Sequence, residues 1–396
     1  MNFVYVSPNF PSYYWHFCDH LKKLGVNVLG IGNTDYDQLE EPMKGALTEY
    51  YKVSDLSDYD QILRACGYFT HKYGHIDHLD SQNEFWLEND ARLRTDFNIE
   101  GTKLATIMDM KRKSLMKDHF KKAGVPSARY QLVTNIDAAK NFIASVGYPV
   151  IVKPDIGVGA SATFALHNEN DLDNFFANLP VCDYIMEEFV KGHILTFDGL
   201  TNYDNKILFA TSHLFPNPVM DVVTGDDHLA FYSLREIDSD LEMAGRKIVA
   251  AFDTSARIFH FEFFRLAEDK NGLGKKGDIV ALEVNMRPPG SYMLDMINYA
   301  SDIDIYQMWA TMIVHKGLKS EIDRKYHCAY ASRKNHKKYL HSHTDILATY
   351  GENIVFHTEI EQLFSRAMGN YTYIFRSPSL DIIKKMIAYI QAEKPQ

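Results

Sequence analysis

The chain contains little cysteine and no paired cysteine motif. Its 396 residues include four cysteines, and no two of them form a C-x-x-C pair. They are Cys18, Cys66, Cys182 and Cys328. This separation gives neither the ligand spacing of a zinc site nor an evident disulfide framework. We therefore expect free thiols in a reducing cytosol and a cytoplasmic location.

The chain also lacks an excess of positive charge and a long apolar run. It carries 42 Lys and Arg against 52 Asp and Glu, a formal net charge of −10. A main partner such as nucleic acid or an anionic membrane would require a basic face, so we expect neither. No apolar run approaches the roughly 18 residues that span a bilayer. The first segment, "MNFVYVSPNF", has no basic stretch and contains a proline, so it resembles a first strand rather than a signal peptide.

Hydrophobic periodicity divides the chain into three parts. Strands at "FVYVS" and "VNVLGIG" flank an amphipathic helix over residues 12–24, an order that predicts a parallel sheet with a right-handed crossover. We predict an N-terminal open α/β domain over residues 1–105. An α+β region over 106–316, beginning with a helix at about 107–123, and a small C-terminal α+β region over 317–396 follow.

The segment "DIVALEVNMR" has the pattern of a strand with polar residues at alternate positions. Glu283, Asn285 and Arg287 occupy every second position. They should share one face, because a strand sends successive side chains to opposite faces. The alternation predicts a core-facing row of Val280, Leu282, Val284 and Met286, with Ile279 and Ala281 on the polar side.

A hairpin would bring a second carboxylate to this face. If "FHFEFFRL" pairs with "DIVALEVN" so that Leu266 lies opposite Ile279, Glu262 falls opposite Glu283. Opposed buried carboxylates must be protonated, paired or metal-bound. With Asn285 they provide three hard oxygen ligands, which suit Mg²⁺ bound to nucleotide phosphates. A lone E-x-N is more often a solvated strand face, but the apolar surroundings and the second glutamate favour the metal site.

Two further segments could contact a nucleotide. In "YPVIVKPDIGVGASATFAL", Lys153 ends a strand and precedes a loop with Gly157, Gly159 and Ser161, whose backbone N–H groups could close over phosphates. This is no P-loop, since the lysine precedes the glycines, and alone it would fit a hairpin turn better. In "YIMEEFVKG", the backbone of Glu188 and Val190 could meet an adenine edge while the Glu187 carboxylate accepts from the exocyclic amine.

The order and spacing of these motifs resemble the ATP-grasp superfamily. The shared series is Lys113 before a helix, Lys153 with the 157–161 loop, the E-E-F-V segment at 187–190, Glu262, and E-x-N-x-R at 283–287. The resemblance covers about residues 1–316 and is greatest to stand-alone proteins of the carbamoyl-phosphate synthase large chain-like type. It implies a two-lobed ATP-grasp fold behind a small α/β domain. This chain has one ATP-grasp copy rather than two, so we do not expect the full synthase reaction.

The resemblance also implies cofactors and residue roles. It implies ATP and Mg²⁺, with Mn²⁺ as an alternative metal. Lys113 and Lys153 would neutralise phosphates, the 157–161 loop would cover them, residues 187–190 would bind adenine, and Glu262, Glu283 and Asn285 would hold the metal. Arg287 would stabilise an acyl phosphate or orient the substrate carboxylate, and together with Lys153 it is our expected catalytic residue. The family's ribose-binding glutamate after Gly192 is replaced by His193 and Ile194, which leaves Asp198 as a candidate substitute.

The implied activity is an ATP-dependent carboxylate–amine ligase. It would phosphorylate a small carboxylate, such as an amino acid, and let an amine displace phosphate. Specificity would involve "SPNFPSYYW" and "RPPGSYMLDMIN", with Ser291, Tyr292 and Asp295 near the substrate. A carboxylate–thiol ligase, a non-catalytic ATP-binding regulator and a kinase that stops at phosphorylation are the alternatives. Small-molecule substrates are the expected partners, and a monomer and a homodimer both remain open.

Overall fold

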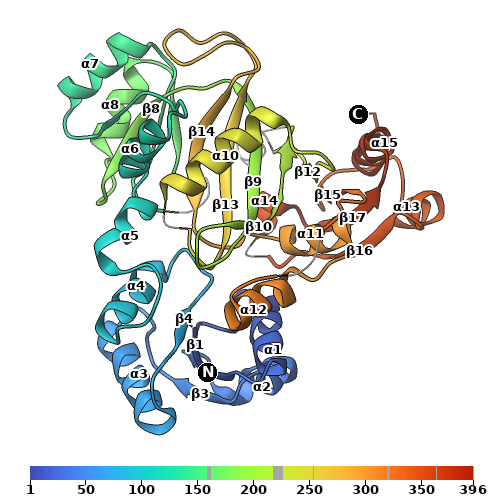
Figure 1. Ribbon diagram of the computed structural model, residues 1–396. Helices are drawn as coiled ribbons and strands as arrows, with labels where there is room; N and C mark the ends of the chain where they lie inside the picture. Colours follow the sequence, from blue (N-terminus) through green and yellow to red (C-terminus); the bar gives the residue numbers. More distant parts are fainter. Residues whose placement is uncertain (158–161, 217–225, 253, 319–321, 363, 396) are drawn as a thin grey trace.

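Three β-sheets organise the computed structural model of the protein (Figure 1). The structure describes residues 1–157, 162–216, 226–252, 254–318, 322–362 and 364–395. A four-stranded parallel sheet belongs to the N-terminal domain, and a four-stranded antiparallel sheet belongs to a small lobe. A long antiparallel sheet lies next to the small lobe and continues to the C-terminal strands. This arrangement confirms the predicted mixed α/β class.

The N-terminal domain is an open α/β unit with strand order β3-β2-β1-β4. Both pairs made by β1, and the β2–β3 pair, are parallel, as the βαβ pattern predicted. Its strands are β1 (Asn2–Val6), β2 (Asn27–Gly32), β3 (Glu49–Lys52) and β4 (His78–Asp80). Its helices are η1 (Ser12–Tyr14), α1 (Trp15–Lys23), η2 (Tyr36–Gln38), α2 (Glu41–Ala46), α3 (Tyr59–Tyr73) and α4 (Leu87–Asp96). Helix α1 buries Phe17, Cys18 and Leu21, which share one face because they are spaced by three or four residues.

The small lobe has an antiparallel sheet of order β5-β8-β6-β7. Its elements are β5 (Tyr130–Leu132), α7 (Ile136–Val146), β6 (Val150–Pro154), β7 (Phe164–Leu166), α8 (Glu169–Ala177) and β8 (Tyr184–Glu188). Val150, Val152, Tyr184 and Met186 from β6 and β8 form a core with apolar residues of α7 and α8. The lobe therefore presents the sheet face opposite those helices to the rest of the molecule (Figure 1).

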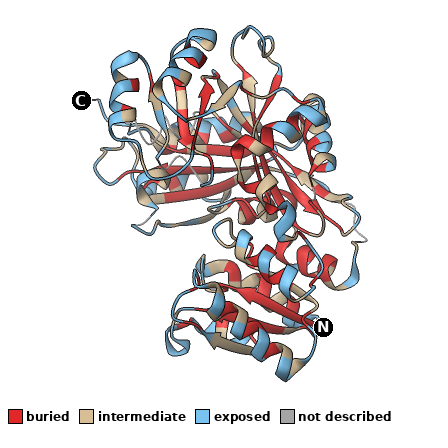
Figure 2. Cartoon of the chain, turned by 90° about the vertical axis from the view of Figure 1, so that its left-hand side faces the viewer, coloured by how far each residue is buried: buried red, intermediate tan, exposed pale blue. Residues whose placement is uncertain are grey.

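The central sheet follows the order β14-β13-β9-β11-β12-β15-β17-β16, with β10 paired to β9. Its first strands are β9 (Gly192–Thr201), β10 (Ile207–Thr211), β11 (His213–Phe215), β12 (Ala230–Ser233), β13 (Ile258–Leu266) and β14 (Ile279–Asn285). The helices around them are α5 (Leu104–Lys111), α6 (Lys113–Ala123), α10 (Ser239–Ala251), α11 (Met293–Ser301) and α12 (Ile305–His315). One apolar cluster joins α10 and α6 to one face of β9, β13 and β14, so that face is core and the other is free for polar groups. The strands of this sheet are largely buried (Figure 2).

The C-terminal residues extend the central sheet instead of forming a sheet of their own. They contribute β15 (His327–Arg333), α13 (His343–Tyr350), β16 (Ile354–Glu359), α14 (Ser365–Met368), β17 (Tyr371–Ser377) and α15 (Leu380–Gln391). Strand β15 pairs with β12 of the preceding region, from Ala230 opposite Ala331 to Tyr232 opposite Ala329. The division into 1–105, 106–316 and 317–396 stays a prediction, and the last boundary falls before a strand of a shared sheet.

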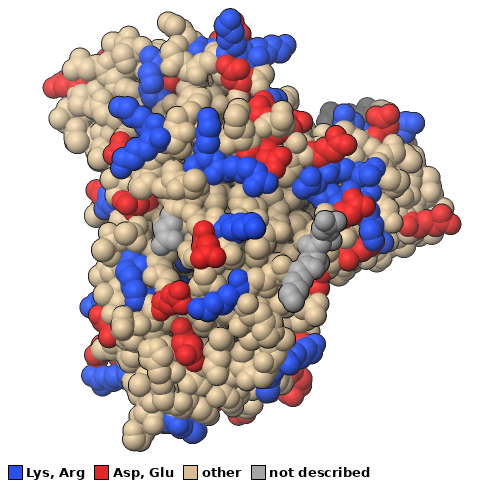
Figure 3. Space-filling view, viewed as in Figure 1, with Lys and Arg blue, Asp and Glu red and all other residues tan. Residues whose placement is uncertain are grey.

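Charged residues of both signs lie on the face of the molecule that Figure 3 shows. Lys and Arg alternate with Asp and Glu across the face shown in Figure 3. None of the helices in the described part of the chain combines the length and apolar character of a membrane span.

A glycine in α10 sets how closely this helix approaches the central sheet. A Cβ at Gly245 would lie 2.3 Å from a ring atom of Phe197, a fully buried residue of β9. We predict that Gly245→Ala destabilises the fold by about 1–3 kcal/mol, because overpacking outweighs the helix propensity gained. The measurement is the free energy of unfolding in a denaturant titration.

Gly67→Ala is the matched control for this prediction. Gly67 lies within α3, and a Cβ there would meet nothing within 4 Å. It should stabilise the protein by about 0.5–1 kcal/mol. Equal stabilisation by both substitutions would contradict the close packing of α10 on β9.

Candidate active site

The predicted pair of glutamates lies face to face on the central sheet. Glu262 of β13 is directly opposite Glu283 of β14, and His260 is opposite Asn285. Asn285 is buried, while both glutamates are partly exposed. The register therefore brings the three predicted oxygen ligands to one face of two adjacent strands, as the sequence predicted.

The predicted register was nevertheless wrong between this pair and the loop of the hairpin. Arg265, not Leu266, lies opposite Ile279, because the register shifts between Glu262 and Phe263. The extra residue on β14 forms a β-bulge at Leu282 and reverses the alternation of faces. Ile279 and Ala281 consequently pack in the same apolar cluster as Val284 and Met286, whereas Val280 packs in a different one.

A buried chain of hydrogen bonds runs from the neighbouring strands to Glu262. Asp198 of β9 lies opposite His260 in the sheet register. The His260 ring joins Asp198 Oδ1 through Nδ1 at 2.5 Å and Glu262 Oε1 through Nε2 at 3.2 Å. Both ring nitrogens must donate, since ionised carboxylates only accept. Sequence reasoning missed His260 entirely, although its position two residues before Glu262 places both on one face of a strand.

The charges along this chain shift the pKa of each member. Burial would raise the pKa of Asp198, but His260 and His213 lower it to about 2. Burial would lower the pKa of His260, but Asp198 and Glu262 raise it to about 9. Burial also opposes ionisation of Glu262, and His260 brings its pKa below the ordinary value. The arrangement thus keeps Glu262 ionised.

Asp198 has no oxygen free of intramolecular contacts. Oδ2 accepts from His213 Nδ1 at 2.8 Å and from the Thr196 hydroxyl, while Oδ1 contacts His260. Its predicted role in ribose binding stays a prediction, and that role would require at least one of these bonds to break.

Lys113 reaches the acidic pair from the start of α6. The predicted single helix over 107–123 is in fact two helices, α5 and α6, separated by Arg112 in an extended conformation. The Asp155 carboxylate caps the start of α6, accepting from the Ser114 backbone N–H at 2.8 Å and from Arg112 Nη1 at 3.0 Å. Lys113 Nζ consequently lies 2.9 Å from the Gly157 carbonyl oxygen and 3.4 Å from Glu283 Oε1.

The small lobe and α6 together form a buried lysine–glutamate–lysine cluster. Lys153 Nζ lies 2.6 Å from Glu187 Oε2, and Lys117 forms an ion pair with Glu187 Oε1. Burial would raise the pKa of Glu187, but the two lysines lower it to about 2. Burial lowers the pKa of Lys117 despite this partner, whereas Glu187 and Glu283 raise the pKa of Lys153 against its burial. Sequence reasoning missed Lys117, one helical turn after Lys113 on the same face of α6.

The other predicted nucleotide contacts lie on the same segments. The Glu188 side chain is turned to Arg129, whose Nε and Nη2 donate to Oε2 at 3.0 and 2.6 Å. The Glu188 backbone N–H donates to the Arg129 carbonyl oxygen at 3.0 Å, and Val190 is buried, so the adenine contacts of 188–190 stay a prediction. Gly157 takes a φ of +153° and accepts from Lys113. Gly159 and Ser161 lie outside the described residues.

Arg287 bridges the central sheet and the N-terminal domain. Its Nε lies 3.6 Å from Glu84 Oε2, and its Nη2 donates to Asn285 Oδ1 at 3.2 Å. Burial raises the pKa of Glu84 and Arg287 opposes the rise. Glu84 was missed because it follows β4, about 200 positions from Glu283, and no local pattern links the two.

The two loops predicted to determine specificity touch each other. The Tyr13 hydroxyl donates to the Ser291 carbonyl at 3.0 Å, so "SPNFPSYYW" and "RPPGSYMLDMIN" meet beside Arg287. Burial raises the pKa of Asp295 to about 6, with Asp304 adding to the rise and the Tyr306 hydroxyl opposing it. The ring centroids of Tyr292 and Phe356 of β16 lie 5.4 Å apart, with the ring planes tilted by 43°. The predicted residues Ser291, Tyr292 and Asp295 are therefore brought together at the start of α11.

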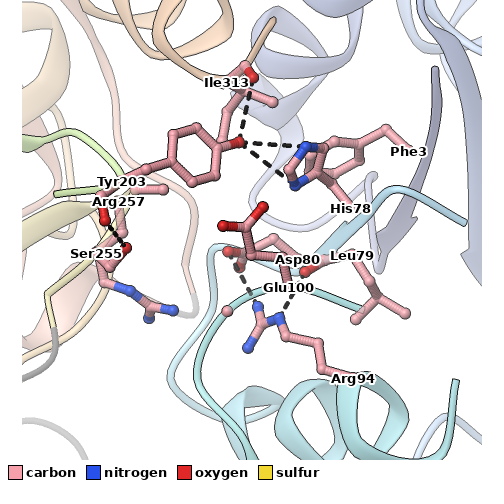
Figure 4. Close-up of a pocket in the computed structure, with 12 residues that line it drawn as sticks. Phe3, His78, Leu79, Asp80, Arg94, Glu100, Tyr203, Ser255, Arg257 and Ile313 are labelled. Atoms are coloured by element: carbon pink, nitrogen blue, oxygen red, sulfur yellow. Dashed lines mark hydrogen bonds and ion pairs between the residues drawn. The ribbon is translucent and has the colours of Figure 1, made fainter. Parts of the chain in front are cut away.

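A tight cavity lies at the junction between the N-terminal domain and the central sheet (Figure 4). Its volume of about 30 Å³ suits ordered water rather than a substrate. The Tyr203 hydroxyl meets His78 Nε2 at 3.2 Å and donates to the Ile313 carbonyl at 3.2 Å. Arg94 pairs with Asp80 at 3.2 Å. These contacts fix the loop after β4, which carries Glu84, against the central sheet.

Lysines from two lobes, an acidic pair on a sheet face and an arginine at the end of the same hairpin form the arrangement that the resemblance to the ATP-grasp superfamily implied. Residues 112–181 match the family model "Carbamoyl-phosphate synthase L chain, ATP binding domain". This matched stretch and the overall fold are similar to those of ATP-grasp ligases.

Relatives in sequence and structure agree with this assignment. An L-arginine-specific L-amino acid ligase of Bacillus subtilis is 23% identical over 281 residues, 67% of this chain and 64% of the relative's own length. The crystal structure of an L-amino acid ligase from Bacillus licheniformis superposes with a TM-score of 0.72 at 14% identity, covering 98% of this chain and 95% of that one. The biotin carboxylase domain of a Hydrogenobacter thermophilus 2-oxoglutarate carboxylase, in complex with MgADP, ADP and bicarbonate, gives 0.69 at 15% identity, covering 99% and 90%.

Glu187 is expected to matter for stability as well as for the site. Glu187→Gln would leave the buried Lys117 and Lys153 without the carboxylate that both contact, so we predict a loss of about 3 kcal/mol in the free energy of unfolding at neutral pH. The stabilisation depends on an ionised carboxylate whose pKa in the fold is about 2. Since that pKa lies below the ordinary value, the difference between wild type and variant should shrink as pH falls from about 4.5 towards 2.

Denaturant titrations at several pH values check this prediction. Glu169→Gln is the control, because Glu169 forms an exposed pair with Lys140 at 2.6 Å and its replacement should leave the unfolding midpoint unchanged. Equal midpoints for wild type and Glu187→Gln at pH 7 would contradict the stabilising role of the cluster.

Proposed function

We propose that the protein is an ATP-dependent ligase that phosphorylates a small carboxylate and couples it to an amine, releasing ADP and phosphate. The observation that carries this proposal is the Glu262–Glu283 pair, opposed in register on one sheet face with Asn285 beside it. Such a pair needs nearby cations. Lys113 at 3.4 Å from Glu283 supplies one, and a divalent metal would supply another. Cytoplasmic location and a small-molecule rather than macromolecular partner remain part of the proposal.

The donor set fits Mg²⁺ bound to a nucleotide. Glu262, Glu283 and Asn285 offer carboxylate and amide oxygens, the ligands this ion prefers, and phosphate and water would complete its shell. When bound, the metal neutralises phosphate charge. Mn²⁺ offers a similar ligand preference and is a proposed alternative.

The residues around the metal site would bind the nucleotide. Lys113 and Lys153 would neutralise the phosphates, as catalysis of phosphoryl transfer requires mostly positioning and charge compensation. Transfer of Lys153 from Glu187 to a phosphate would free Glu187 Oε2, 2.6 Å from Lys153 in this structure, to accept from the adenine amine. Lys117 would keep the other oxygen in place. The ion pair between Lys153 and Glu187 would thus be replaced by one contact from Lys153 to a phosphate and one from Glu187 to adenine.

The carboxylate substrate would lie between Arg287 and the N-terminal domain. Arg287 matches a carboxylate or acyl phosphate in shape and charge. Two largely buried carboxylates, Glu84 beside Arg287 and Asp295 on α11, could each receive an ammonium group. Ser291, Tyr292 and Tyr13 would line it. An amino acid, which carries both groups, is therefore the proposed substrate class, and the amino acid ligases among its relatives support this choice.

Substrate-dependent turnover tests the proposed function. Purified protein with ATP, Mg²⁺ and pairs of amino acids should release ADP and phosphate and form a product with the mass of a condensed pair. Arg287→Ala should lower turnover by at least about 100-fold, because it removes charge stabilisation at the reacting group. Arg246→Ala on the exposed side of α10, where Arg246 pairs with Glu242 of the same helix, is the control and should retain activity.

The same assay separates the alternatives. A product containing a thioester would identify a carboxylate–thiol ligase, and ADP release with one substrate alone would indicate a kinase. Nucleotide binding without ADP release for any carboxylate would contradict the enzyme and favour a regulator.

The pH dependence of substrate binding tests the role of Asp295. Below its pKa of about 6 this group is neutral, so it attracts an ammonium group only as pH rises through that value. We predict that the KM for the amino-acid substrate rises by about tenfold as pH falls from 7 to 5, and that Asp295→Asn abolishes this change. Asp302→Asn at the end of α11, where Asp302 pairs with Lys325 at 3.0 Å, is the control. An unchanged pH profile in Asp295→Asn would contradict the role.

A further inference from the structure

The candidate metal site is backed by a buried network that no sequence motif indicated. Its members lie on three adjacent strands: Thr196 and Asp198 on β9, His213 on β11, and His260 on β13. Thr196, Asp198 and His213 are fully buried, and His260 is 6% exposed. Their polar atoms would be costly at this depth without mutual hydrogen bonds.

The network has a direction that ends at Glu262. Thr196 accepts from the His213 backbone N–H at 3.0 Å, and Asp198 accepts from the His213 ring at 2.8 Å. Asp198 then contacts His260 at 2.5 Å, and His260 contacts Glu262 Oε1 at 3.2 Å. Register fixes the geometry, because Asp198 lies opposite His260 and Thr196 lies opposite Glu262.

The two carboxylate oxygens of Glu262 have different surroundings. His260 Nε2 contacts Oε1, and no hydrogen bond or ion pair to Oε2 is present among the described residues. Its neighbour Glu283 contacts the ammonium group of Lys113 at 3.4 Å instead of a histidine ring. One oxygen of Glu262 is therefore fixed from behind, and the other is available to a ligand on the open face of the sheet.

We propose that Asp198 and His260 are positioning residues that fix Glu262 as a one-oxygen ligand of the divalent cation, with His213 supporting Asp198. This inference rests on the proposed nucleotide–metal function. Residues that orient a ligand from behind typically change metal affinity by about 10–100-fold when removed. In this protein the role of Asp198 is to orient His260, in place of the ribose contact suggested by its position in the sequence.

Two substitutions of His260 separate positioning from simple structural support. The amide nitrogen of Asn can occupy the place of Nδ1, so His260→Asn keeps the bond to Asp198 and loses the bond to Glu262. The amide nitrogen of Gln can occupy the place of Nε2, so His260→Gln keeps the bond to Glu262. Asp198→Asn serves as a third variant, which leaves His260 in place but weakens its anchor.

The experiment measures Mn²⁺ binding to the full-length protein with saturating ADP, by electron paramagnetic resonance, and ADP binding in EDTA by calorimetry. We expect His260→Asn to weaken Mn²⁺ binding by about 10–100-fold, with Asp198→Asn intermediate and His260→Gln closest to wild type. ADP affinity in EDTA should stay within about twofold in all of them. His119→Gln is the control histidine, since it contacts Ala251 and Asp109 away from the sheet face.

The outcomes distinguish this inference from the proposed function. Wild-type Mn²⁺ affinity in His260→Asn, or equal losses of metal-dependent and metal-free ADP binding, would overturn the positioning role while leaving the ligase proposal intact. Wild-type protein without any cation-dependent ADP binding would overturn both. If His260→Asn does not fold, Mn²⁺ binding is compared between Asp198→Asn and wild type. Weakening the bond between Asp198 and His260 must then lower the affinity for Mn²⁺, and an unchanged affinity would overturn the positioning role.

Discussion

Two carboxylates held opposite each other on adjacent strands are the constraint around which the site is arranged. Glu262 and Glu283 repel each other, and the sheet register prevents them from moving apart. Their negative charge is balanced by groups from separate parts of the chain: Lys113 from α6, His260 from the same sheet, and Arg287 beyond β14. The N-terminal domain contacts this region through the ion pair between Glu84 and Arg287. The central sheet, α6 and the N-terminal domain therefore meet around this acidic pair.

Local pattern predicted the parts of the site that lie on one hairpin. The alternation in E-x-N-x-R and the glutamate in "FHFEFF" were enough to place Glu262 opposite Glu283, because strand alternation and hairpin pairing are short-range properties. The bulge at Leu282 was not predictable in this way. It changes the faces of Ile279, Val280 and Ala281 but leaves the acidic pair opposed, so the central prediction was right although the register behind it was wrong.

The parts that sequence reasoning missed are contacts between distant segments. Lys117 meets Glu187, and Asp198 meets His260, only because separate strands and helices come together in the fold. Each of these residues alone is unremarkable: a lysine on a helix, an aspartate and a histidine on strands. Asp198 was assigned a role from its nearness to Gly192, but the register turns it towards β13. Burial and pairing across strands, which one sequence does not reveal, decide what these groups can do.

The C-terminal residues carry no motif for chemistry, yet they determine where the substrate loop lies. Met293 and Met296 of α11 pack in one cluster with Phe231 of β12, Tyr330 of β15 and Ile374 of β17. Helix α11 also carries Asp295 and follows directly from Arg287 and Ser291. Because β15 extends the central sheet through β12, the sheet that holds the acidic pair also supports the helix beside it. The distance between the charged site and the specificity loop is therefore fixed by one continuous sheet rather than by a flexible connection.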